Sequence, residues 1–105
     1  MRQGEIRQRL DTTVAVPQYL LVLSGQIYNA ADTGRVIACR VLPVAPPEDF
    51  AGVRPVSYTN LDGISTIGIA VPELLDWYPR SALGAPVGVV ADMRPVMILV
   101  RSLFT

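Results

Sequence analysis

Apolar residues occur along the chain in short blocks that are separated by turn-forming residues. Two blocks, residues 19–23 and 35–42, are almost continuously apolar, which is typical of strands covered on both faces. Between them, residues 25–34 include Asn, Asp, Thr and Gly, which favour turns. The pattern therefore predicts a central pair of strands joined by a turn-rich link.

Further strands are expected on both sides of this central pair. Residues 4–10 predict a first strand, although three polar residues interrupt its apolar pattern. Later strands are expected over residues 56–59, 64–71 and 86–90. The dipeptide Asp62-Gly63 indicates a hairpin turn. Residues 43–55 are rich in proline, which interrupts central strands, so this segment predicts an exposed loop.

Two helical segments are expected in the second half of the chain. Residues 72–78 begin with a proline and precede another, which fits one helical turn. Residues 92–104 have apolar positions at helical spacing, with Asp92 able to cap the helix and Pro95 in its first turn. Residues 96–100 also fit a strand, so both structures remain open there. The pattern predicts a single domain over residues 1–105 with an α+β, mainly β or barrel-like fold of five to seven strands.

Composition limits the class of protein more than it identifies a function. Half of the 105 residues are hydrophobic and 17% are charged, so we expect a dimer or a permanent partner to cover apolar surface. No apolar run approaches the roughly 18 residues of a membrane span, and the start of the chain lacks the apolar region of a signal peptide. We therefore expect a cytoplasmic protein without a membrane partner.

The charged and reactive residues narrow the possible chemistry. The formal net charge is zero, and all nine basic residues are arginine, whose planar cation suits phosphate. A compositional bias toward arginine also accounts for this usage. Histidine is absent and Cys39 is the single cysteine, which excludes disulfides, histidine-based triads and the usual zinc sites. No metal or cofactor is expected, and Cys39 is predicted to be a buried small side chain.

Five segments and the terminal helix share their order and spacing with a known family. The segments are residues 1–6, 21–24, 28–34, 36–43 and 80–88. They resemble the MazF/PemK toxins of type II toxin–antitoxin systems. The resemblance implies an SH3-like small β-barrel with a C-terminal helix, a homodimer, a small cognate antitoxin as partner, and metal-independent cleavage of single-stranded RNA. The related CcdB toxins inhibit DNA gyrase through a terminal Trp-Gly-Ile, which residues 103–105 do not match.

The residues that carry catalysis in the resembling enzymes are replaced in this chain. In that family an arginine before the second strand stabilises the charge that develops on phosphate, and a Thr or Ser ending the third strand assists. Here the first position is Gln18, and the second is Leu42 or Pro43. Arg40 is the nearest substitute for the catalytic cation, because an arginine in an apolar strand needs a partner, solvent or a ligand phosphate. An edge position or a structural pair with Asp or Glu is the alternative for Arg40.

Other candidate residues concern binding. Arg35 and Arg54 are expected to contact the RNA backbone, and Tyr19 to stack on a base. Trp77 and Tyr78 are candidates for anchoring a partner peptide. Exposure to solvent for the arginines and ordinary packing for the aromatic rings are the structural alternatives. The sequence thus predicts a type II toxin that is either a MazF-like endoribonuclease or a catalytically degenerate protein that binds an antitoxin or another protein.

Overall fold

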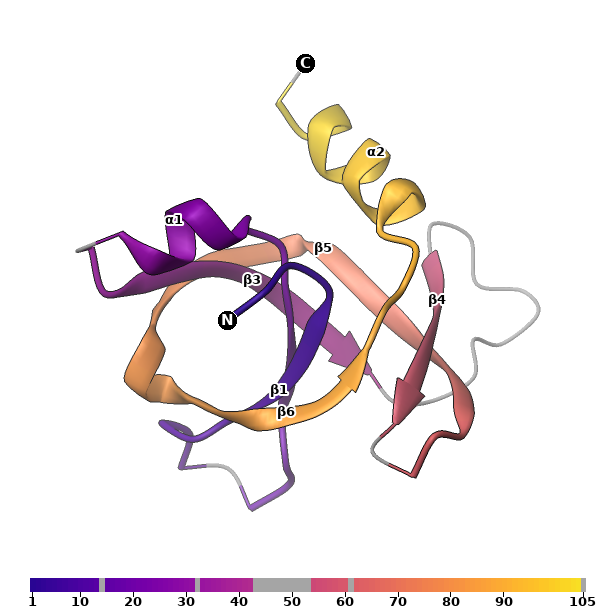
Figure 1. Cartoon of the computed structure of the whole chain (residues 1–105), viewed down its shortest axis with the longest axis horizontal. Coiled ribbons are helices and arrows are strands. Elements are labelled where there is room, and N and C mark those ends of the chain that lie inside the picture. Colours follow the sequence, from indigo (N-terminus) through magenta and orange to yellow (C-terminus); the bar gives the residue numbers. More distant parts are fainter. Residues whose placement is uncertain (14, 32, 43–53, 61, 105) are drawn as a thin grey trace.

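The computed structural model describes residues 1–13, 15–31, 33–42, 54–60 and 62–104 (Figure 1). Within these residues, six strands form a closed antiparallel barrel in the order β1-β2-β3-β5-β4-β6, with β6 pairing back to β1. The strands are β1 (Glu5–Arg9), β2 (Tyr19–Val22), β3 (Arg35–Leu42), β4 (Arg54–Asn60), β5 (Ser65–Pro79) and β6 (Leu83–Val89). The helices are α1 (Gln26–Ala30), the 3-10 turn η1 (Arg80–Ala82) and α2 (Arg94–Ser102). The predicted fold, a small mainly β barrel with a C-terminal helix, is confirmed.

The predicted central strand pair is β2 and β3, and it is buried on both sides. Because side chains alternate along a strand, neighbouring residues of β2 enter different apolar clusters. Leu21 belongs to a first core that also contains Ile6, Cys39, Val41 and Val96, whereas Leu20 belongs to a second core with Val36, Ala38, Tyr78 and Leu83. This two-sided burial explains the continuous apolar run in the sequence.

Cys39 is a fully buried member of the first core, as predicted. Burial raises the pKa of its thiol to about 12, because the thiolate would lose its hydration. The thiol therefore stays protonated at neutral pH and acts as a small apolar side chain.

The helical turn predicted over residues 72–78 is wrong, because this segment belongs to β5. The pairing of β5 with β3 is irregular. In β3, Ala38 and Arg40 are separated by one residue, but their partners in β5, Asp76 and Val71, are separated by the four residues 72–75. The extra residues form a bulge that includes Pro72. Proline has no N–H to donate to a ladder, so it is tolerated where the ladder is interrupted.

The start of β4 also differs from the prediction, which placed residues 54 and 55 in a loop. Pro55 pairs with Ile69 of β5. On its other side, β4 pairs with β6 only through Thr59 and Asn60 among the described residues. Residue 55 therefore has no second neighbouring strand to which a backbone N–H would have to donate, and proline is tolerated there. Residues 43–53 of the predicted loop lie outside the described residues.

The helical alternative for residues 96–100 is correct, since they lie in α2, beside β5 (Figure 1). The Asp92 carboxylate accepts a hydrogen bond of 3.1 Å from the backbone N–H of Arg94, the first helical residue, and pairs with its guanidinium. Val96 enters the first core, whereas Ile98 on the other side of the helix is 67% exposed. Among the described residues, no helix has the length and apolar character needed to cross a membrane.

Tyr58 of β4 fits between two glycines. A Cβ atom on Gly68 would lie 3.1 Å from Cε1 of Tyr58, and one on Gly88 would lie 2.9 Å from Cδ2. The ring therefore occupies space that any larger residue at these positions would fill. The arrangement also explains the small residues of β5: Gly68 and Ala70 share the face of the sheet that packs inside, whereas Ile67 is 52% exposed.

Replacing Gly88 by serine is expected to destabilise the fold. The new Cβ would also lie 3.2 Å from the Thr59 carbonyl oxygen, so the strand or the Tyr58 ring must shift. We expect the free energy of unfolding in urea to fall by about 1–3 kcal/mol. Gly25→Ser is the matched control, because nothing lies within 4 Å of its Cβ and serine is accepted at the start of a helix. Equal stability of the two variants would contradict this account of Tyr58.

Candidate functional site

Three arginines lie on one side of the sheet formed by β1, β2 and β3. Arg7 pairs with Leu20, and Leu20 pairs with Arg40, so the two arginines flank Leu20 on the same side. Arg9 follows Arg7 by two residues along β1 and shares this side. Adjacent strands are about 4.8 Å apart, which places the backbones of Arg7 and Arg40 roughly 10 Å apart. We call Arg7, Arg9 and Arg40 the arginine face.

Two members of the arginine face are held by partners in the protein. Arg7 donates from Nη1 to the Gly84 carbonyl oxygen at 2.8 Å and from Nη2 to Glu5 at 3.0 Å. Arg9 donates from Nε to Asp11 at 2.6 Å, and this bond raises the pKa of its guanidinium. The same guanidinium lies 5.3 Å from the centre of the Tyr78 ring, in a cation–π contact. These contacts fix both side chains in place.

Arg40 is different, because its cation has no comparable partner. The side chain is half-buried, and its Nε atom, like that of Arg7, is buried without a hydrogen-bond partner. Among the residues that the structure describes, none forms an ion pair with Arg40. An unpartnered buried donor costs about 1–3 kcal/mol, and an anionic oxygen would remove this cost. Within the described part of the chain, Arg40 is thus the arginine of this face whose cation is not paired with a carboxylate.

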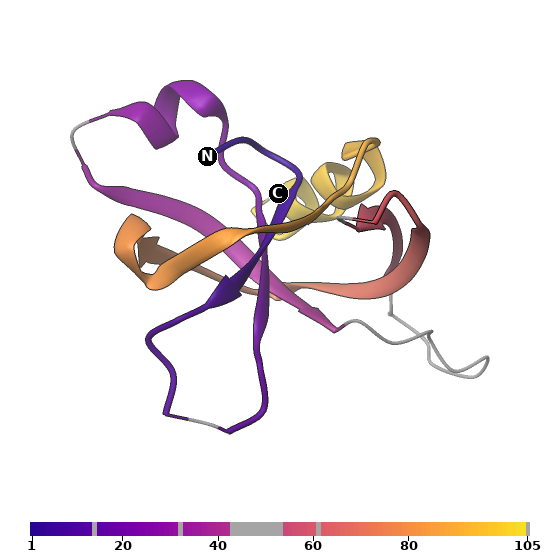
Figure 2. The same cartoon turned by 60° about the horizontal axis from the view of Figure 1, so that its bottom comes forward.

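Gln18 lies near this arginine and Tyr19 does not. Gln18 ends the segment between β1 and β2, which projects from the barrel (Figure 2), and its carbonyl oxygen accepts from the Arg9 N–H at 2.8 Å. It lies two positions before Leu20, on the side of the arginine face. Tyr19 pairs with Val41 on the opposite side. The structure therefore brings Gln18 and Arg40 to one surface and directs Tyr19 elsewhere.

The remaining candidates are spread over other parts of the barrel. Arg35 begins β3 about 16 Å from Arg40, and it lines an open cleft with Tyr28, Thr33 and Trp77. Trp77 is 60% exposed, whereas Tyr78 is 8% exposed and packs in the second core. Of these two aromatic residues, Trp77 is therefore the one that presents its ring to solvent. The backbone of Arg54 pairs with Ala70, and its side chain lies outside the described part of the structure.

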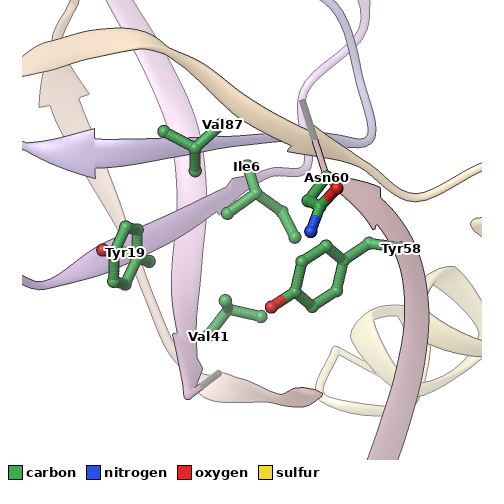
Figure 3. Close-up of a pocket in the computed structure, with 6 residues that line it drawn as sticks. All are labelled: Ile6, Tyr19, Val41, Tyr58, Asn60 and Val87. Atoms are coloured by element: carbon green, nitrogen blue, oxygen red, sulfur yellow. The ribbon is translucent and has the colours of Figure 1, made fainter. Parts of the chain in front are cut away.

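Tyr19 lines a pocket on the side of the sheet opposite the arginine face (Figure 3). The pocket has a volume of about 190 Å³ and receives side chains from five strands. Its lining residues are Ile6, Tyr19, Val41, Tyr58, Asn60 and Val87. We call this space the tyrosine pocket. Its wall is mostly apolar and includes two tyrosines and one side-chain amide.

The sequence analysis missed Arg7, Arg9 and Asn60. A signal for the two arginines was present: charged residues at positions 5, 7 and 9 alternate with period two, which is the spacing of one face of a strand. No comparable signal existed for Asn60, the last residue of β4, which pairs with Gly88 of β6. Within the described residues, no group of three acidic or cysteine side chains is placed to hold a metal ion.

The fold and the arginine face define a small closed-barrel protein with three arginines on one side of its sheet. Residues 4–103 match the family described as "Type II toxin-antitoxin system toxin Rv0299". Toxin Rv0299 of Mycobacterium tuberculosis (strain ATCC 25618 / H37Rv) is 40% identical over 103 residues, which cover 95% of this chain and 94% of that relative. The chain therefore belongs to this family of type II toxins. The predicted toxin class is confirmed, and the finer assignment to MazF/PemK stays a prediction.

Methionine variants of Arg40 and Arg7 are expected to differ in stability. Arg40→Met removes a buried donor that has no partner, so the free energy of unfolding should stay unchanged or rise. Arg7→Met leaves the Gly84 carbonyl oxygen and Oε2 of Glu5 without the donor that Arg7 provides, so it should lower this free energy by about 1–3 kcal/mol. Urea denaturation of the two variants measures the difference. A larger loss for Arg40→Met would show that Arg40 has a stabilising partner.

Proposed function

We propose that this type II toxin is a MazF-like, metal-independent endoribonuclease that cleaves single-stranded RNA at the arginine face. The observation that supports the proposal is the half-buried cation of Arg40, which forms no ion pair with a described residue, beside two arginines that each pair with a carboxylate. Such a site lacks one anionic group, and a phosphodiester supplies it. We further propose that the protein acts in the cytoplasm and that a small cognate antitoxin neutralises it.

The proposed reaction needs one cation at the phosphate. The 2′-hydroxyl attacks the adjacent phosphorus, the bond to the 5′ oxygen breaks, and the products carry a 2′,3′-cyclic phosphate and a 5′-hydroxyl. Water accepts the proton of the 2′-hydroxyl and supplies the proton that the leaving oxygen gains. Negative charge develops on the phosphate oxygens, and Arg40 stabilises it. Gln18, at the position of the family's arginine, donates a hydrogen bond to the RNA but supplies no charge.

Removing the Arg40 cation is expected to abolish most of the cleavage. Mixed-sequence single-stranded RNA is incubated with the purified toxin in EDTA, and the products are resolved on a gel. We expect Arg40→Ala to cleave about 100-fold more slowly, as for other losses of a transition-state donor. Arg94→Ala is the control, because it removes one exposed arginine of α2 and the same formal charge. Equal rates for the two variants would contradict the role of Arg40.

A second candidate function is binding without cleavage, by a degenerate MazF/CcdB-fold protein that acts on its antitoxin or on another protein. It is favoured by the residues at the family's catalytic positions, since Gln18 carries no charge and Leu42 carries no hydroxyl. Trp77, exposed beside Arg35 and Tyr28, would then serve as an anchor for the partner. Growth arrest in the host without RNA cleavage by the wild-type toxin would favour this function over the first.

We also propose that the toxin is a homodimer that uses the exposed face of α2. Ile98 is 67% exposed and Phe104 is 73% exposed, which is costly for apolar side chains that remain in water. Light scattering after size exclusion is expected to give twice the monomer mass of 11.4 kDa. Ile98→Glu should shift the protein to the monomer, because the carboxylate would be buried in the interface. A wild-type monomer at high micromolar concentration would contradict this proposal.

A further inference from the structure

We propose that the tyrosine pocket binds one unpaired base of a single-stranded RNA. This inference rests on the proposed action on RNA, although the pocket lies on the opposite side of the sheet from Arg40. Figure 3 shows Tyr19 and Tyr58 on two sides of a space bordered by Ile6, Val41 and Val87. The space is partly open to solvent, so a ligand can enter it without unfolding the barrel.

The first observation is the fixed orientation of the Asn60 amide. Its Oδ1 atom accepts hydrogen bonds of 3.0 Å from the backbone N–H groups of both Asp62 and Ile64. These two bonds determine which end of the amide faces the turn. The Nδ2 atom then points toward the pocket (Figure 3), and no hydrogen bond from it to any described residue is formed. The pocket therefore contains a donor whose direction is set before any ligand arrives.

The second observation is the rigid position of Tyr58. A Cβ atom on Gly88 would lie 2.9 Å from its ring and one on Gly68 would lie 3.1 Å from it, so the ring packs directly against both glycines. Val41 and Ile6, both nearly completely buried, close the pocket from the first core. The ring of Tyr58 and the pocket volume are therefore set by the packing of the barrel, and little order has to be gained on binding.

A base matches both observations. Its flat faces contact aromatic and aliphatic side chains, and its carbonyl or ring nitrogen accepts from the Asn60 amide. An aliphatic side chain of a protein partner would fill the apolar part but would leave the Asn60 amide without a partner. The chemistry of the wall therefore favours a base over an aliphatic side chain.

The test compares RNA with and without bases. Fluorescein-labelled RNA hexamers of each of the four bases, and an abasic hexamer with the same phosphates, are titrated with the toxin at fixed salt. We expect at least one base to bind about tenfold more tightly than the abasic hexamer, because stacking and one hydrogen bond are added. The comparison isolates the base, since phosphate contacts are the same in all probes.

The decisive variant is Asn60→Asp. Its carboxylate still offers an oxygen to the N–H groups of Asp62 and Ile64, as the amide Oδ1 does, but a second oxygen replaces the Nδ2 donor. We expect it to remove the difference between the base-containing and abasic hexamers. Ser57→Asp is the matched control, because this exposed residue adds the same charge on the other face of β4 and should leave the difference intact. Tyr58→Phe, which keeps the ring and removes the hydroxyl, provides a second variant if Asn60→Asp fails to fold.

Cleavage of the same hexamers in EDTA separates this inference from the proposed function. If the wild-type toxin cleaves RNA and Asn60→Asp retains base-dependent binding, the pocket proposal is overturned and the endoribonuclease proposal stands. If the wild-type toxin binds bases without cleaving, and Asn60→Asp loses this preference, the pocket proposal stands alone. A variant that weakens the complex with the antitoxin but leaves RNA binding unchanged would assign the pocket to a protein partner and overturn the inference.

Discussion

The pairing of β2 with β3 buries apolar side chains on both sides of these strands. Leu20, Leu21 and Cys39 are completely buried, and burial of each leucine stabilises the fold by about 1.5–3 kcal/mol. A shift of the register by one residue would exchange the members of the two cores, so the register is strongly determined. Arg40 is the polar residue that this register places among apolar neighbours. Its position on the arginine face is therefore a consequence of the packing of β2 and β3.

The arginine face and the tyrosine pocket are formed by consecutive residues of the same strands. Arg7 follows Ile6, and Arg40 precedes Val41, so each strand contributes a cation to one surface and an apolar wall to the other. The two surfaces are thus separated by the thickness of one sheet. A substitution that moves the backbone of β1 or β3 would change both surfaces together. The separate roles of the two surfaces are therefore better tested by side-chain substitutions that retain the packing.

The sequence predicts the architecture well because the apolar pattern of β2, β3 and the terminal helix is regular and local. It fails at β5, where Pro72 suggests a helix start, because the bulge that accommodates this proline depends on pairing with a strand distant in sequence. The candidate residues show the same limit. Arg40 is found in the sequence because an arginine is unusual in an apolar strand. The pocket forms only when Tyr19, Tyr58 and Asn60 come together in the fold, and their positions in the sequence do not predict this contact.

The ladder between β1 and β6 joins the first and last strands of the chain and closes the barrel, with Glu5 opposite Val89 and Ile6 opposite Gly88. During synthesis, the first strand has no partner on that side until almost the whole domain has left the ribosome. The nascent chain therefore exposes the edge of β1 and the apolar residues of both cores for most of its translation. Partners that recognise extended apolar segments have access to the chain in this interval, before the closed barrel exists.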